Sequence, residues 1–138
     1  MDNTTHNLPL PQKLKGTVRH FKGNGRKLGY PTANIDTTTA LGDGVYFGFA
    51  SLGQYMHCPA LIFIGTPTTV GDTVRRVETH ILDAEDIDYY DLVIDIDIQK
   101  FHRNNQNFAS IDELMIAMKA DEKAGRAWAA LHRQNDVN

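Results

Sequence analysis

The chain has 138 residues, of which 41% are hydrophobic and 22% charged, and its formal net charge is −3. This length fits one domain, and the absence of a basic excess disfavours a general nucleic-acid-binding protein. The longest apolar run is too short to span a bilayer, and the N-terminus lacks the features of a signal peptide. We therefore expect a cytoplasmic monomer that binds neither nucleic acid nor membranes.

Five short runs in the first hundred residues have the composition of β-strands. They cover residues 14–21, 45–52, 57–64, 74–82 and 92–101. The last run is the clearest, because Ile94, Ile96 and Ile98 alternate with Asp95 and Asp97 at a period of two. No helical segment alternates with these runs, which disfavours a parallel βαβ architecture. Closely spaced strands divided by glycine turns favour an antiparallel barrel or sandwich.

A long helix is predicted after the strands, over residues 110–132. Ser110-Ile-Asp-Glu113 has the pattern of a capping box, which satisfies N–H groups at the start of a helix. Apolar residues then recur at helical spacing, including Met118 and Trp128, and core packing explains them better than ligand contact. The helix is expected to bend or break at Gly125.

The segment from Gly23 to Asn34 carries the strongest sign of a binding site. It reads Gly-Asn-Gly-Arg-Lys-Leu-Gly-Tyr-Pro-Thr-Ala-Asn. Glycines let backbone N–H groups approach a ligand, Lys27 adds positive charge, and Thr32 and Asn34 offer neutral oxygens two residues apart. These features suit a polyphosphate with its metal ion, although the spacing matches neither the Walker loop nor the dinucleotide fingerprint. The alternative is a glycine-rich hairpin turn with solvated cations.

Two further regions hold residues that could carry chemistry. A carboxylate at Glu78 that faced the interior or mouth of a barrel would need a hydrogen bond or a ligand, and the alternative is a solvated glutamate facing outward. His80 shares its face of the strand, either as a metal or acid–base partner or as a hydrogen-bonded neighbour. Arg103 and Phe108, at the junction of strand and helix, could bind a ring system with a polar tail or could be structural.

Seven short motifs occur in a fixed order along the chain. They are Gly16-Thr-Val18, Gly29-Tyr-Pro-Thr-Ala-Asn34, Gly44-Val-Tyr46, Ile64-Gly65 with Pro67-Thr68, Val77-Glu-Thr-His-Ile-Leu-Asp83, Asp88-Tyr-Tyr90, and Arg103 to Phe108 followed by the Ser110 helix. Together they resemble the riboflavin kinase (flavokinase) family over about residues 14 to 127. The resemblance implies transfer of the γ-phosphate of ATP to the 5′-hydroxyl of riboflavin, with FMN and ADP as products.

The same resemblance implies a fold and a division of the chain. It implies a small closed antiparallel Greek-key β-barrel of about six strands with a C-terminal α-helix. The expected organisation is a flexible N-terminus at 1–12, a kinase domain at 13–132 with its barrel in 13–103 and its helix in 110–132, and a flexible C-terminus at 133–138.

Roles for individual residues also follow from the resemblance. Glu78 matches the catalytic base, and Thr32 and Asn34 match the residues that bind Mg²⁺, for which Mn²⁺ or Zn²⁺ are alternatives. The expected nucleotide-binding residues are Gly23, Gly25, Lys27, Gly29, Pro31, Thr32, Asn34, Ile81, Asp83 and Tyr90. The expected flavin-binding residues are Arg103, Asn105 and Phe108.

Three departures from the family pattern leave the affinity for flavin open. Asp91 stands where family members often have glycine, Asn105 stands where they usually have glutamate, and Gly65-Thr66-Pro67 is one residue shorter than the usual segment. Only about a dozen residues precede the domain, so we expect a stand-alone kinase module without an adenylyltransferase domain. The alternatives are a catalytically silent flavin-binding sensor or regulatory module and an unrelated all-β binding domain.

Overall fold

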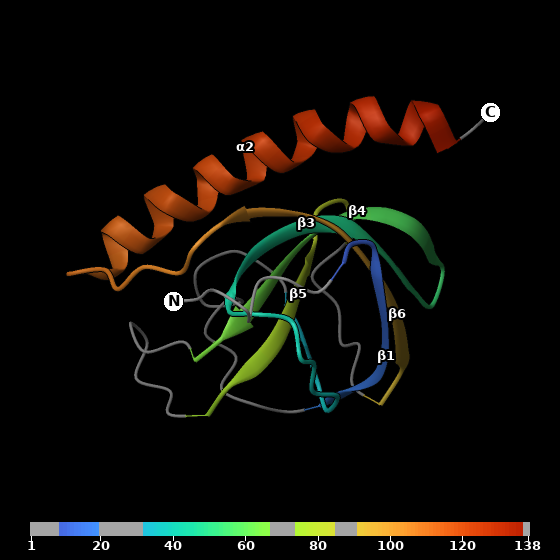
Figure 1. Ribbon diagram of the computed structural model, residues 1–138, viewed down its shortest axis with the longest axis horizontal. Coiled ribbons are helices and arrows are strands. Elements are labelled where there is room, and N and C mark those ends of the chain that lie inside the picture. The colour runs from blue at the N-terminus through green and yellow to red at the C-terminus, as the bar shows by residue number, and fades with distance from the viewer. Residues whose placement is uncertain (1–8, 20–31, 67–73, 85–90, 137–138) are drawn as a thin grey trace.

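A computed structural model describes residues 9–19, 32–66, 74–84 and 91–136 of the chain (Figure 1). In these ranges six strands are followed by one long helix. The strands are β1 (Gln12–Arg19), β2 (Ala33–Ile35), β3 (Gly44–Leu52), β4 (Tyr55–Gly65), β5 (Arg76–Ile81) and β6 (Val93–Arg103), and the helix is α2 (Ile111–Asp136). The described part of the chain contains no helix with the length and hydropathy of a membrane span.

The strands close into a barrel in which all neighbours are antiparallel. Their order around the barrel is β1-β2-β5-β4-β3-β6, and β6 pairs back onto β1. β3, β4 and β5 follow one another as a meander, and β6 returns to lie beside β3. The resulting order β6-β3-β4-β5 is that of a Greek key. The expected closed Greek-key barrel with a C-terminal helix is therefore confirmed.

The barrel interior is built from alternate residues of the strands. Ile94, Ile96 and Ile98 of β6 are fully buried while Asp95 is exposed, so the period of two seen in the sequence is confirmed. Every strand contributes aliphatic or aromatic side chains to this core, among them Val18, Ile35, Tyr46, Ile62, Val77 and Ile96.

A second apolar layer lies between the barrel and α2, which crosses the outside of the barrel over β3 and β4 (Figure 1). Phe47 and Phe49 alternate with inward residues of β3 and therefore point out toward the helix. The ring centroid of Trp128 on α2 lies 5.8 Å from that of Phe47 and 5.4 Å from that of Phe49. Trp128 is thus a packing residue, as its helical spacing predicts.

The helix runs without interruption through Gly125, so the expected bend or break there is wrong. A Cβ atom at Gly125 would lie 2.8 Å from Leu61 and 3.4 Å from the Phe47 ring. The glycine therefore serves close approach of the helix to the barrel. The helix also ends at Asp136, beyond the expected end at residue 132.

The capping box forms nearly as predicted. The backbone N–H of Glu113 donates to the Ser110 hydroxyl at 3.2 Å, and the Glu113 carboxylate accepts from the backbone N–H of Ala109 at 3.1 Å. The carboxylate thus reaches one residue further back than in the standard box. These bonds fix the direction in which the chain enters α2.

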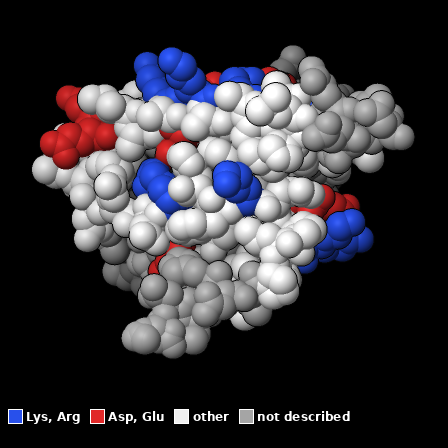
Figure 2. Space-filling model, turned by 45° about the horizontal axis from the view of Figure 1, so that its top comes forward, with Lys and Arg blue, Asp and Glu red and all other residues white. Residues whose placement is uncertain are grey.

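Charged side chains are dispersed over the face of the molecule drawn in Figure 2. On the side of the molecule that includes α2, Lys and Arg lie in separate small groups between uncharged areas (Figure 2). Several cations are held by local carboxylates: Arg19 lies 3.3 Å from Asp36, and Arg75 lies 2.8 Å from Asp43. Any polyanion bound near these residues would therefore depend on individual contacts more than on a broad field.

Candidate active site

Asn34 and Glu78 lie directly opposite each other on neighbouring strands. Asn34 is the middle residue of β2, and the register of β2 with β5 pairs it with Glu78. Directly opposed side chains share one face of a sheet, with Cβ atoms about 5 Å apart. Ile35 and Val77, the next residues on the two strands, belong to the interior core, so Asn34 and Glu78 face outward. Thr32 lies one residue before β2 and is half-buried.

The side-chain amide oxygen of Asn34 has no hydrogen-bond partner in the part of the chain that the structure describes. Asn34 is 5% exposed, and its Oδ1 is buried without a hydrogen-bond partner in the described ranges. A buried polar atom of this kind costs free energy unless it binds something else. Thr32, Asn34 and Glu78 together offer oxygen donors only, which suits a hard divalent cation such as Mg²⁺. The described residues contain no cluster of three or more histidine, cysteine or acidic side chains able to hold a metal.

His80 follows Glu78 on the outer face but is covered by the helix. It is 8% exposed, and its cross-strand neighbour Leu61 belongs to the apolar layer beneath α2. Burial lowers the pKa of His80 to about 4, and the nearby Asp121 carboxylate only partly opposes this effect. The imidazole is therefore neutral at neutral pH. This placement favours the structural alternative for His80.

The expected nucleotide residues fall into two groups. Ile81 is buried in the barrel core, and Asp83 lies exposed in the turn after β5. Asp83 accepts from Arg126 of α2 at 2.8 Å, and the same guanidinium donates to the carbonyl oxygen of Leu82 at 2.8 Å. The other expected nucleotide residues lie outside the described residues, namely Gly23, Gly25, Lys27, Gly29, Pro31 and Tyr90.

Asp91 occupies a backbone position that suits glycine. Its φ angle is +71°, in the left-handed region that aspartate tolerates better than most residues. Its backbone N–H donates to the carbonyl oxygen of Val18 at 2.9 Å, and its carboxylate lies 3.4 Å from Arg19. This departure from the family pattern therefore keeps a glycine-like backbone conformation, and the added charge has a neighbouring cation.

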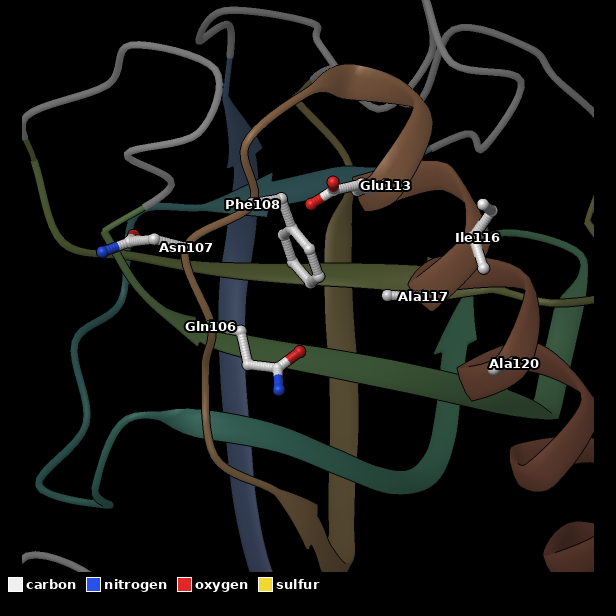
Figure 3. A pocket seen from close by; sticks show the side chains of 7 residues that line it. All are labelled: Gln106, Asn107, Phe108, Glu113, Ile116, Ala117 and Ala120. Carbon is white, nitrogen blue, oxygen red and sulfur yellow. The ribbon is translucent and has the colours of Figure 1, made fainter.

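An open pocket of about 670 Å³ lies between the β6–α2 connection and the start of α2 (Figure 3). It is lined by Gln106, Asn107, Phe108, Glu113, Ile116, Ala117 and Ala120. In Figure 3 the Phe108 ring and the Gln106 side chain point from the connection toward the helix, and the Asn107 side chain points away. An aromatic ring, small apolar residues and a few polar groups are typical of the lining of a small-molecule site.

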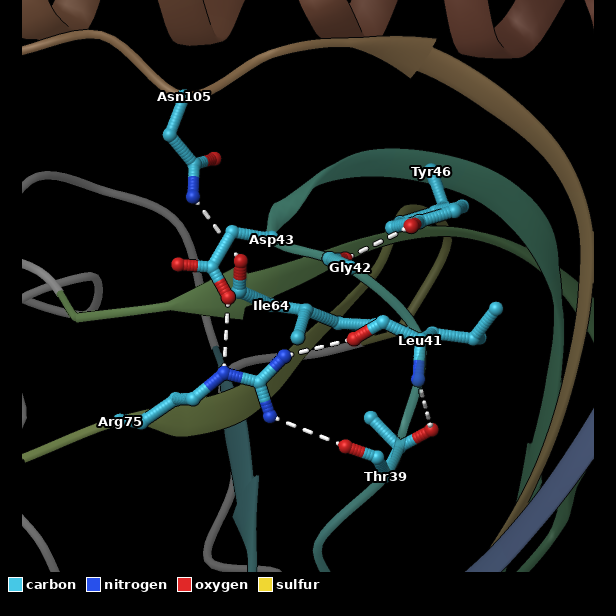
Figure 4. A network of polar contacts seen from close by, with 8 residues as sticks. All are labelled: Thr39, Leu41, Gly42, Asp43, Tyr46, Ile64, Arg75 and Asn105. Atoms are coloured by element: carbon cyan, nitrogen blue, oxygen red, sulfur yellow. Dashed lines mark hydrogen bonds and ion pairs between the residues drawn. The ribbon is translucent and has the colours of Figure 1, made fainter. Parts of the chain in front are cut away.

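The other two expected flavin residues anchor this connection. Arg103 donates from Nε and Nη2 to the two carboxylate oxygens of Asp121, at 2.9 and 2.7 Å. Asn105 donates from Nδ2 to the carbonyl oxygen of Ile64 at 2.9 Å (Figure 4), a bond that the family's usual glutamate could not form. Gly65 leaves room for Asn105, because a Cβ atom there would overlap its amide nitrogen. Neither residue lines the pocket.

Figure 4 also shows how the chain before β3 is held next to this anchor. Arg75 donates to Asp43 at 2.8 Å and to the carbonyl oxygens of Leu41 and Thr39 at 2.7 and 3.1 Å. Tyr46 donates its hydroxyl to the carbonyl oxygen of Gly42 at 2.7 Å. These bonds fix the segment that enters β3 against the start of β5.

Sequence reasoning missed most of the pocket wall. Glu113 was identified only as a helix cap, and Ile116, Ala117 and Ala120 were not singled out. These four helical residues follow a spacing of three and four positions, so they lie on one side of the helix. This spacing, close after Phe108 in the chain, is the sequence signal that could have indicated the pocket wall. Asp121 could not be recognised, because its importance depends on Arg103, eighteen residues away in the chain.

A family model described as "Flavokinase: Riboflavin kinase" matches residues 8–129. The chain belongs to the riboflavin kinase family. Among its relatives, the bifunctional riboflavin kinase/FMN adenylyltransferase of Escherichia coli K12 is 35% identical over 124 residues, which are 88% of this chain and 39% of that protein. The human riboflavin kinase is 31% identical over 119 residues, which are 81% of this chain and 77% of that enzyme.

A solved riboflavin kinase structure has the same fold. The enzyme from Trypanosoma brucei superposes with a TM-score of 0.66 at 24% identity, covering 86% of this chain and 76% of that one. The chain spans only about two fifths of the bifunctional bacterial relative, and most of the human one. The family predicted from the seven motifs is thus confirmed.

Proposed function

We propose that this protein is a riboflavin kinase, which transfers the γ-phosphate of ATP to the 5′-hydroxyl of riboflavin and gives FMN and ADP. The observation that carries the proposal is the pairing of Asn34 with Glu78 in a chain of this family. This register sets a buried amide oxygen, which has no partner among the described residues, beside a carboxylate on one face of the barrel. The first suits a metal–phosphate group, and the second can accept a proton.

Glu78 is the proposed general base. Its carboxylate accepts the proton of the 5′-hydroxyl as that oxygen bonds to the γ-phosphorus, and the bond from this phosphorus to the bridging oxygen of ADP breaks. Thr32 and Asn34 would hold a divalent cation that neutralises phosphate charge when bound, and their oxygens suit Mg²⁺, with Mn²⁺ or Zn²⁺ as alternatives. The other proposed nucleotide contacts are Gly23, Gly25, Lys27, Gly29, Pro31, Ile81, Asp83 and Tyr90.

The pocket at Phe108 is the proposed site of the flavin ring. Glu78 is paired with Phe63 of β4, and the next residue of that strand, Ile64, holds Asn105 through its carbonyl oxygen. Asn105, the residue before the wall residue Gln106, is therefore bonded to β4 one residue along from the position that pairs with Glu78. This arrangement would leave the ribityl chain of a bound flavin free to extend toward the base.

A turnover assay tests the proposal. The protein is incubated with riboflavin, ATP and Mg²⁺, and FMN is detected by chromatography. Glu78→Gln should lower kcat by about 10²–10⁴ while riboflavin and ATP still bind, because only the proton acceptor is lost. Asp95→Asn, on the exposed face of β6, is the matched control and should keep the kcat of the parent.

The same assay separates the enzyme from the alternative of a silent flavin-binding module. Riboflavin binding without FMN formation would support the silent module, and a Glu78→Gln variant with near-normal kcat would exclude Glu78 as the base. The remaining expectations, a monomer that works in the cytoplasm without nucleic acid or membrane, stay predictions.

A further inference from the structure

An ion pair outside the lining of the pocket beside Phe108 joins the two chain segments that form its walls. Its lining residues all lie between Gln106 and Ala120 in the chain. Arg103 lies just before this stretch, Asp121 lies just after it, and two hydrogen bonds of 2.9 and 2.7 Å join them. The ion pair therefore ties together the two ends of the chain segment that forms both walls of the pocket.

Asp121 is buried and fully engaged in this contact. Its side chain is 7% exposed, and its Oδ1 also lies 3.2 Å from Nε2 of His102, the residue before Arg103. Removing a carboxylate from water is costly, and a buried ion pair is often no more stabilising than an apolar pair of the same volume. Stability alone is therefore a weak explanation for this pair. A bidentate bond does, however, fix the distance and direction between two chain segments.

The chain on either side of the ion pair is held as well. Arg103 donates its remaining Nη1 group to the carbonyl oxygen of Asn104 at 3.0 Å, and Asn105 is bound to Ile64. Three consecutive residues of the connection are therefore involved in fixed polar contacts directly before the first wall of the pocket. The second wall begins at Glu113, whose carboxylate caps the helix.

We infer that Asp121 is a positioning residue for the flavin, which acts through Arg103. By holding Arg103 it sets the separation between the residue 106–108 wall and the helical wall, and so the fit of a flat tricyclic ring between them. This inference rests on the proposed function, in which the pocket takes the ring. It assigns Asp121 no contact with the substrate and no part in phosphoryl transfer.

Titration of riboflavin by its own fluorescence, together with steady-state kinetics, tests this role. Asp121→Asn should raise the Kd and the KM for riboflavin about tenfold, because small displacements of positioning groups have large effects. We expect less than about a twofold change in the KM for ATP. A purely structural role would lower the folded fraction, and with it kcat, but would leave both KM values unchanged. Glu122→Gln, the adjacent carboxylate, whose partner is Arg126, should keep the riboflavin Kd of the parent.

Two further variants keep the test decisive. Asp121→Glu retains the charge but lengthens the side chain, so it should fold even if Asp121→Asn does not, and should still weaken riboflavin binding. In an Arg103→Ala background, Asp121→Asn should have no additional effect, because Asp121 acts through Arg103. An unchanged riboflavin Kd in Asp121→Glu, or an equal effect of Asp121→Asn in both backgrounds, overturns the inference.

The proposed function and this inference can fail separately. If the parent binds riboflavin but makes no FMN, the proposed activity is wrong, and the Kd values of the variants still judge the role of Asp121. If the parent makes FMN and the Asp121 variants bind riboflavin normally, the activity stands and the inference fails. A parent that does not bind riboflavin refutes both.

Discussion

The buried imidazole of His80 should make the protein less stable in mild acid. Burial beneath α2 lowers the pKa of His80 from 6.5 to about 4. Between these two values the unfolded chain binds a proton that the folded chain does not, so the free energy of unfolding decreases as the pH falls. A shift of this size amounts to about 3 kcal/mol in full, of which about 2 kcal/mol is lost between pH 7.5 and pH 5.

Urea denaturation at pH 7.5 and pH 5 measures this effect. Other groups also titrate in this interval, so the relevant quantity is the loss of unfolding free energy in the parent minus that in His80→Gln, which carries no titrating side chain. We expect a difference of about 2 kcal/mol at an unchanged m-value. His132→Gln, which alters an exposed histidine of α2, should retain the behaviour of the parent. Equal losses in the parent and in His80→Gln would refute the reasoning.

Two further predictions concern the metal ligands and the turn before β6. Thr32→Ala and Asn34→Ala should weaken MgATP binding and turnover together, because each removes an oxygen donor to the metal ion. Riboflavin binding without nucleotide should change little. Calorimetric titrations that show normal MgATP binding in both variants would contradict the proposed metal site. Asp91→Gly should leave the unfolding free energy unchanged or raise it, whereas Asp91→Ala should lower it by about 1 kcal/mol, because alanine is strained at a φ of +71°. Thermal denaturation distinguishes these outcomes, and equal stability of the two variants would exclude strain at this position.

The regular parts of the fold were predictable because their signals are local. The alternation in β6 and the capping box at Ser110 depend on neighbours within a few residues, and both are confirmed. β2 was not predicted as a separate strand, because three residues are too few for a period to appear. Its strand conformation depends on pairing with β1 and β5, which are distant in the chain.

Gly125 shows why a local rule can give the wrong result. Glycine lowers helix propensity, so the sequence suggested an interruption. In the structure the missing side chain lets α2 approach Leu61 and Phe47, and packing against the barrel outweighs the loss of about 1 kcal/mol in propensity. Which residue faces the glycine depends on where the helix crosses the barrel, and the sequence does not specify that position.

The same limitation applies to the arginines near the site. A guanidinium can be recognised in a sequence as a candidate anion or ring partner, but its real partner depends on which elements the fold brings together. Arg103 meets Asp121, and Arg126 meets Asp83, so α2 is bonded to the chain at the end of β6 and at the turn after β5. The first contact lies beside the proposed flavin pocket, and the second involves a proposed nucleotide residue. Asp121 and Arg126 are five residues apart, about 7.5 Å along the helix axis. One helix is thus bonded next to both proposed substrate regions, although it lies outside the barrel.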